Sequence, residues 1–282
     1  MRPRFRLSAR RWRIFLWATI LAIPLAVALF GPIVADLAPS GRGTPFSAAS
    51  WSPFGTDRLG RDVLVAALEG GRSLLAVTVS TVLLTYLVGL VIGLLAAAVE
   101  RPWLEDLIMR PIDVLLCLPS LLIIMVAALR SEGSPVAVAV AVGLALLAPI
   151  TRFVRMAARE VVRSPVMDAL RMQGESLYHR YGRYAARELA RPIAADLGVR
   201  FSTAIYFVAS ANFLGLGFDP TGSDWAVSVA TNKDGLAIAP WSVLLPASLI
   251  VLLVVGVNLL WDEILADPRL VATRSAVAGN ER

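Results

Sequence analysis

The sequence has little of the chemistry on which most enzymes depend: one cysteine, one histidine and one lysine in 282 residues. Cys117 cannot form an internal disulfide, and its apolar neighbours predict a small core residue. His179 has no clustered cysteine or carboxylate partners, which disfavours a metal site. The motifs of phosphate-binding loops, serine hydrolases and zinc proteases are absent from the sequence. We therefore expect no enzyme activity and no cofactor bound by this chain.

Apolar residues are abundant instead. They make up 57% of the chain against 17% charged residues, which is typical of a membrane protein. The net charge of +6 comes mostly from arginines beside apolar runs. Such arginines set orientation and contact anionic lipid, so we expect the lipid bilayer rather than nucleic acid as a partner.

The apolar runs predict an all-α protein with six transmembrane helices. These are expected at about residues 14–35, 73–98, 107–129, 136–150, 196–218 and 241–261. The third is interrupted by Pro111, Asp113 and Pro119, and Gly89 and Gly93 would allow the second to pack closely on a neighbour. The basic N-terminus and the arginine-rich interval 152–200 fall on the same side, which predicts that both termini are cytoplasmic.

Two polar segments are expected outside the cell membrane, at 36–72 and 219–240. In the first, a turn leads into a short amphipathic helix that Thr56 or Asp57 could cap. Asp113 lies within a predicted span. It would be either a contact for a transported solute or ion, or simply a partner of Arg110 or a group near the membrane interface, and we favour the second interpretation.

The longest arginine-rich interval runs from Asp168 to Pro192 and predicts two short helices with Gly174 between them. Asp168 near a helix start suits the helix dipole, and Gly174 permits a turn that a Cβ atom would hinder. This interval is either a docking site for a partner or only a basic surface loop that maintains orientation.

Four motifs, in order, resemble the permease subunits of ABC importers in the dipeptide, oligopeptide and nickel branch. The resemblance covers about residues 12–270. The first motif contains Gly55, Thr56, Asp57, Gly60, Arg61 and Asp62. The others are Asp113-Val114-Leu115-Leu116 with Leu118-Pro119-Ser120; Phe213-Leu214-Gly215-Leu216-Gly217 with Trp225 and Ala239-Pro240-Trp241; and Asn258-Leu259-Leu260 with Asp262 and Asp267-Pro268-Arg269-Leu270.

The resemblance implies a type I ABC importer permease fold with a cytoplasmic coupling helix that docks on an ATPase subunit. Its coupling residues would be Asp168, Ala169, Leu170, Gly174, Glu175 and Ser176. The chain departs from the motif at Asp168, where the family has glutamate, at Leu170, where it has alanine, and at Ala186-Arg187, where it has Leu-Pro. The implied division is residues 1–70 with the first span and the external amphipathic segment, a permease domain of five helices at 71–262 with its coupling loop at about 160–192, and a tail at 263–282.

The implied partners are a sister permease, two ATPases that bind ATP and magnesium, and an extracytoplasmic binding protein. The implied location is the bacterial inner membrane, and the cargo would be peptides, nickel or metal chelates. Two other functions stay open from the sequence: a secondary transporter driven by an ion gradient, and a membrane subunit that does not transport.

Overall fold

The computed structural model describes residues 4–38, 41–48, 52–129, 134–215, 219 and 221–265, and within these ranges the protein is helical without a named strand. The elements in order are α1 (Arg4–Ala35), α2 (Val63–Glu69), α3 (Gly71–Ala98), α4 (Pro102–Cys117), α5 (Ser120–Leu129), α6 (Pro135–Val162), α7 (Pro165–Met172), the π-helix η1 (Tyr178–Ala185), α8 (Ala186–Phe213), α9 (Trp225–Asn232), the short 3₁₀ helix η2 (Lys233–Gly235) and α10 (Trp241–Leu265).

The predicted membrane class is confirmed by five helical segments long and apolar enough to span a bilayer, within the described ranges. α4 and α5 together would make a sixth span. They are not one continuous helix, because the chain bends by 86° between them. The bend follows Cys117 and precedes Ser120, so it coincides with the predicted interruption at Pro119. A proline removes a backbone donor and disfavours helical geometry in the residue before it.

Three predicted span boundaries are wrong. α6 continues to Val162 rather than ending near Ile150, because buried Val154, Ala158 and Val162 extend its apolar stripe at four-residue spacing. The fifth helix begins ten residues earlier than predicted, since α8 starts at Ala186 and follows η1 without a break. α10 likewise extends to Leu265, past the predicted end of the sixth span near residue 261.

The centre of the fold is the contact between α3 and α6. A Cβ atom on Gly89 would lie 2.8 Å from Ile150 Cγ2, and one on Gly93 would lie 2.8 Å from Val154 Cγ1. The predicted close packing at these glycines is therefore confirmed. Cys117 was predicted to be a core residue, which is wrong: it is exposed at the end of α4.

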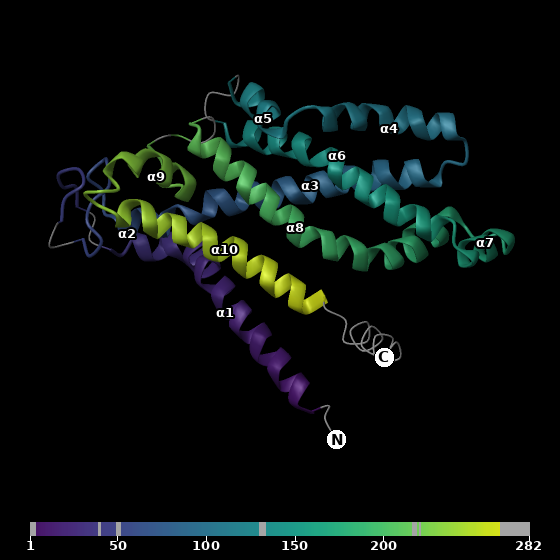
Figure 1. Cartoon of the computed structure of the whole chain (residues 1–282), viewed down its shortest axis with the longest axis horizontal. Helices are drawn as coiled ribbons and strands as arrows, with labels where there is room; N and C mark the ends of the chain where they lie inside the picture. Colours follow the sequence, from purple (N-terminus) through teal and green to yellow (C-terminus); the bar gives the residue numbers. More distant parts are fainter. Residues whose placement is uncertain are drawn as a thin grey trace, which may run out of the picture.

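The elements that concern function lie at opposite ends of the bundle (Figure 1). α2 and α9 are at one end, and α7 is at the other, reached by α3, α6 and α8. The motif residues Leu216, Gly217 and Asp267-Pro268-Arg269-Leu270 lie outside the described residues, as does most of the predicted tail. The predicted domain division at 70 and 262 stays a prediction.

Candidate functional site

The α7–η1 loop, residues 165–185, forms the predicted pair of short helices around a glycine turn. The Ser164 hydroxyl caps α7 by accepting the Met167 N–H at 3.3 Å. Met167 is fully buried and anchors the loop to the bundle. Gly174 has φ +73°, a left-handed conformation that strongly favours glycine, and its N–H donates to the Arg171 carbonyl at 3.0 Å. The predicted glycine turn is confirmed.

The six residues predicted for coupling lie in α7 (Asp168, Ala169 and Leu170) or in the turn that follows it (Gly174, Glu175 and Ser176). Asp168 is in the first turn of α7 and forms a 3.8 Å ion pair with Arg171. Leu170 accepts the Glu175 N–H at 3.1 Å, and Ala169 accepts that of Gln173 at 3.0 Å. Two further contacts hold the start of the second helix: Ser176 Oγ accepts the His179 N–H at 3.2 Å, and Glu175 lies 3.6 Å from the His179 ring.

Large apolar side chains are exposed on the same loop, which the sequence interpretation missed. Val166 is 51% exposed, Met172 84%, Leu177 65% and Tyr178 80%. The loop is otherwise rich in arginine and projects from the bundle at the α7 end (Figure 1). Exposed apolar side chains in such a place mark a surface that another molecule covers. Four apolar residues spaced along a charged interval were the signal that could have revealed the surface.

A second candidate site is the platform, defined as residues 41–48, 52–62, α2, residues 221–224, α9 and residues 233–240. Gly55 and Gly60 both have positive φ, +77° and +71°, and shape its first turn. Thr56 is fully buried, where its hydroxyl donates to the Thr44 carbonyl at 2.7 Å. Asp57, also buried, accepts the Leu59 and Arg61 N–H groups at 2.8 Å each.

The predicted cap of the short external helix is wrong. Asp62, not Thr56 or Asp57, caps α2 by accepting the Leu64 N–H at 2.7 Å. Most residues of this predicted motif therefore make hydrogen bonds within the platform and hold its shape. Arg61 joins its two halves, because it donates to Asp57 Oδ2 at 2.8 Å and to the Thr221 carbonyl at 2.8 Å.

The platform is fastened to α3 and α8 through buried groups. Within the platform, the fully buried Trp225 joins α9 to α2, because its indole N–H donates to the Ala67 carbonyl at 2.6 Å. Asp224 caps α9 and also accepts the Ser73 hydroxyl at 2.7 Å and the Asn212 side-chain amide at 3.2 Å. Burial raises the pKa of the Asp224 carboxyl above its ordinary value, and these hydrogen bonds only partly oppose that.

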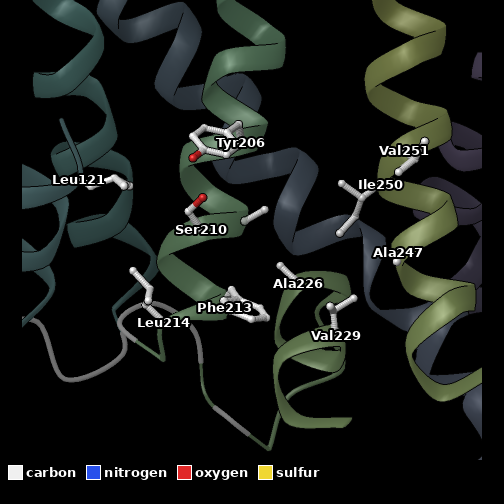
Figure 2. A pocket seen from close by; sticks show the side chains of 11 residues that line it. Leu121, Tyr206, Ser210, Phe213, Leu214, Ala226, Val229, Ala247, Ile250 and Val251 are labelled. Atoms are coloured by element: carbon white, nitrogen blue, oxygen red, sulfur yellow. The ribbon is translucent and has the colours of Figure 1, made fainter. Parts of the chain in front are cut away.

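A recess of about 440 Å³ opens beneath the platform where α5, α8, α9 and α10 meet. It is lined by Leu121, Tyr206, Ala209, Ser210, Phe213, Leu214, Ala226, Val229, Ala247, Ile250 and Val251. Figure 2 shows the side chains of α8 between Leu121 on one side and Ile250 on the other. Tyr206 and Ser210 contribute the hydroxyls of an otherwise apolar lining.

The prediction that Asp113 pairs with Arg110 is wrong. Asp113 binds Arg152 of α6 at 2.7 Å, and both side chains are about half exposed. A second intramembrane ion pair was missed: Asp196 accepts from Arg200 at 3.0 Å and from the Tyr86 hydroxyl at 2.6 Å. The sequence places Asp196 at the edge of a predicted span and gives no indication of its contact with α3.

Comparison with known proteins agrees with this geometry. Residues 89–264 match the family described as "Binding-protein-dependent transport system inner membrane component". The chain is 31% identical over 255 residues to the di/tripeptide transport system permease protein DppC of Pseudomonas aeruginosa, covering 86% of this chain and 84% of that one.

Two further relatives are similar over most of their length. A putative peptide permease of Brucella abortus is 31% identical over 79% of this chain and 75% of its own. The probable D,D-dipeptide permease DdpC of Escherichia coli is 27% identical over 89% of this chain and 86% of its own. The chain is therefore a multi-pass inner-membrane permease of the ABC importer type, and it belongs to the peptide branch of the binding-protein-dependent transport family.

Proposed function

We propose that this permease forms half of a translocation pore for di- or oligopeptides. A sister permease supplies the other half, two separate ATPases bind ATP and magnesium, and a binding protein delivers the cargo. Peptides are favoured over nickel or metal chelates because the relatives described above are named as peptide permeases. Both termini are cytoplasmic in this arrangement.

The observation that carries the proposal is the exposed apolar surface of the α7–η1 loop. Met172 and Tyr178 are 84% and 80% exposed on a loop whose turn is fixed by Gly174. A rigid loop with apolar side chains and flanking arginines suits insertion into a partner protein. The ATPase is that partner in the proposal, and Asp168, Ala169, Leu170, Gly174, Glu175 and Ser176 shape the inserted turn.

In the proposal, the binding protein docks on the platform, at the end of the bundle opposite α7 (Figure 1). The platform is held by Asp57, Arg61 and Trp225, so its outer loops present a fixed surface. The recess below it, with Tyr206 and Ser210, then faces the route of the cargo. Transport would proceed when movement of the ATPases displaces α7 and, with it, the helices that reach the recess.

The ion-gradient alternative receives less support. Such a transporter needs intramembrane carboxylates available to an ion. Asp113 and Asp196 are each bound by an arginine, at 2.7 and 3.0 Å. Both carboxylates are therefore already paired with a positive charge of the protein.

A cross-linking experiment tests the proposal. Cys117→Ser removes the one native cysteine, and Tyr178→Cys then places a thiol on the proposed docking surface. A photoactivatable maleimide on Tyr178→Cys should capture the ATPase in membranes that contain the whole transporter. Leu37→Cys is the matched control, since Leu37 is 83% exposed near the other end of the bundle.

The expected result is an adduct of the ATPase with the thiol at 178 and none with the thiol at 37. Equal labelling of the ATPase from both positions, or capture only from position 37, would overturn the proposed orientation of the chain. Capture from neither position, with both thiols shown to be labelled, would overturn the proposed docking.

A further inference from the structure

Three arginines on α6 hold α4 through a short series of ion pairs, here named the charge ladder. Arg155 Nε donates to Glu105 Oε1 at 2.6 Å, and Arg159 Nη2 to Glu105 Oε2 at 3.1 Å. The third is the Arg152–Asp113 pair at 2.7 Å. Positions 152, 155 and 159 are spaced by three and four residues, so the three arginines lie on one face of α6.

Glu105 is the centre of the ladder. Its side chain is 9% exposed, and the side chains of Arg155 and Arg159 are 26% and 35% exposed. Screening by water is weak at such a buried carboxylate, so its two arginines are held more firmly than a surface pair would be. The two carboxylates stand eight residues apart on α4, so the ladder fixes that helix at two points.

α4 has few other attachments. Besides Glu105, its buried residues are Met109 and Ile112, which join a small apolar cluster with Ala96 and Ala148. Figure 1 shows α4 lying along the outside of α6. The ladder is therefore a large part of what makes α4 follow α6.

The ladder lies between the α7–η1 loop and the recess. On one side, only Arg163 and Ser164 separate α6 from α7, and Ser164 Oγ bonds both the Val161 carbonyl at 2.7 Å and the Tyr184 hydroxyl at 3.2 Å. On the other side, α4 passes through the 86° bend into α5, where Leu121 lines the recess. Contacts therefore connect α7 to the recess through α6 and α4.

We infer that Arg152, Arg155 and Arg159, with Glu105 and Asp113, are positioning residues that transmit movement of α7 to the bent α4–α5 pair, so that the recess opens or closes with the ATPase cycle. The inference rests on the proposed function. Such coupling requires a two-state element that both the α7–η1 loop and the recess bias, and the inference gives that role to the bent pair. Without the ladder, α6 would move while α4 stayed behind.

A merely stabilising ladder predicts a different result from a transmitting one. Loss of a stabilising contact lowers the amount of folded transporter, and so it lowers uptake and ATP hydrolysis together. Loss of a transmitting contact leaves ATP hydrolysis in the folded transporter and lowers the uptake that each hydrolysis drives. The ratio of uptake to hydrolysis therefore separates the two roles.

The experiment measures that ratio for the whole transporter in proteoliposomes, with its ATPases, its binding protein and a labelled dipeptide. Glu105→Gln keeps the shape of the side chain and removes its charge. Asp106→Asn is the matched control, because Asp106 is the next residue of α4 and is exposed. Arg152→Asp reverses one charge at an exposed pair, and the double variant with Asp113→Arg restores opposite charges.

We expect Glu105→Gln and Arg152→Asp to lower uptake per ATP hydrolysed by about fivefold or more, the range of typical coupling effects. Asp106→Asn should match the wild type, and the swapped pair should recover most of the loss seen with Arg152→Asp. If Glu105→Gln does not fold, Arg152→Asp and its swap decide the question alone, since that pair is half exposed.

If the ratio of uptake to hydrolysis is unchanged in the variants, or if uptake and hydrolysis fall in parallel, the ladder does not transmit movement. The proposed function would remain intact. A folded wild-type transporter that hydrolyses ATP without uptake would overturn the proposed function, and the ladder would fall with it. The wild-type and variant measurements thus distinguish the two failures.

Discussion

Arg61 and Thr221 lie 160 residues apart in the sequence, yet the Arg61 guanidinium donates to the Thr221 carbonyl at 2.8 Å. The same guanidinium pairs with Asp57, whose carboxylate is 3% exposed. One side chain therefore ties the turn after α1 to the segment that leads into α9. The motif residues of the first turn act by building the platform and lie largely inside it.

Arg61→Ala should destabilise the platform, because it removes a charged hydrogen bond and leaves Asp57 buried with fewer donors. We expect a loss of about 1–3 kcal/mol in the free energy of unfolding. Thermal unfolding of the purified subunit in detergent measures it. Arg58→Ala is the control, since the Arg58 guanidinium forms no ion pair or hydrogen bond with the described residues. Equal stability of the two variants would contradict the account.

Gly174 has room for a side chain, because no atom of the described residues, apart from its two chain neighbours, lies within 4 Å of a Cβ built there. Its φ of +73° is the constraint. Gly174→Ala should cost about 1–2 kcal/mol, and Gly174→Asn less, since asparagine tolerates this conformation. Gly174→Pro cannot adopt it and also loses the hydrogen bond to Arg171.

The measurement for this series is ATP-driven uptake in proteoliposomes, normalised to folded transporter. The expected order is glycine, asparagine, alanine, proline, with proline inactive. An active Gly174→Pro variant would show that the turn is dispensable.

Gly93→Ala should loosen the contact of α3 with α6. The added Cβ would lie 2.9 Å from Val154 Cβ and 3.0 Å from the backbone nitrogen of Arg155, neither of which is a flexible side-chain end. We expect a loss of about 1–3 kcal/mol from overpacking. Denaturation in mixed micelles measures it, and Val91→Ala, on the exposed side of α3, is the control. A Gly93→Ala protein as stable as wild type would mean that the helices can separate without cost.

Asp224 makes the stability of the platform depend on pH. Burial raises the pKa of its carboxyl, so the folded state holds the proton more tightly than the unfolded state. Stability contributed by this group is therefore greatest below the unfolded pKa of about 3.9 and falls as pH rises toward the folded pKa. Asp224→Asn keeps a capping side chain without this titration.

Unfolding midpoints from pH 4 to 8 check the prediction for Asp224. The wild type should lose stability across this range relative to Asp224→Asn. Asp224→Ala should be less stable than both by about 1–3 kcal/mol, because Ser73 and Asn212 lose their acceptor. Parallel pH curves for the wild type and Asp224→Asn would contradict the assigned role.

The sequence was most informative where one physical property dominates. Apolar runs predicted the spans, Pro119 predicted the break, and Gly174 predicted the turn, since each effect is local. Span ends were poorly predicted because arginines at 152, 155 and 159 resemble a membrane boundary when read alone. Their carboxylate partners lie on another helix, so α6 continues past them.

Contacts between distant segments were the part that the sequence could not provide. Nothing in the neighbourhood of Arg61 indicates Thr221, and nothing near Asp196 indicates Tyr86. The charge ladder had a usable signal, since three arginines share one helical face and Glu105 follows a short turn. The pairing itself still required the arrangement of α4 against α6.

The most direct test of the whole account is purification of the tagged chain in mild detergent, followed by identification of bound proteins and an ATPase assay. The account predicts that a sister permease and ATPase subunits copurify, and that the complex hydrolyses ATP faster when binding protein and peptide are added. A chain that purifies alone across several detergents, and that transports solute in liposomes under an ion gradient without ATP, would contradict it.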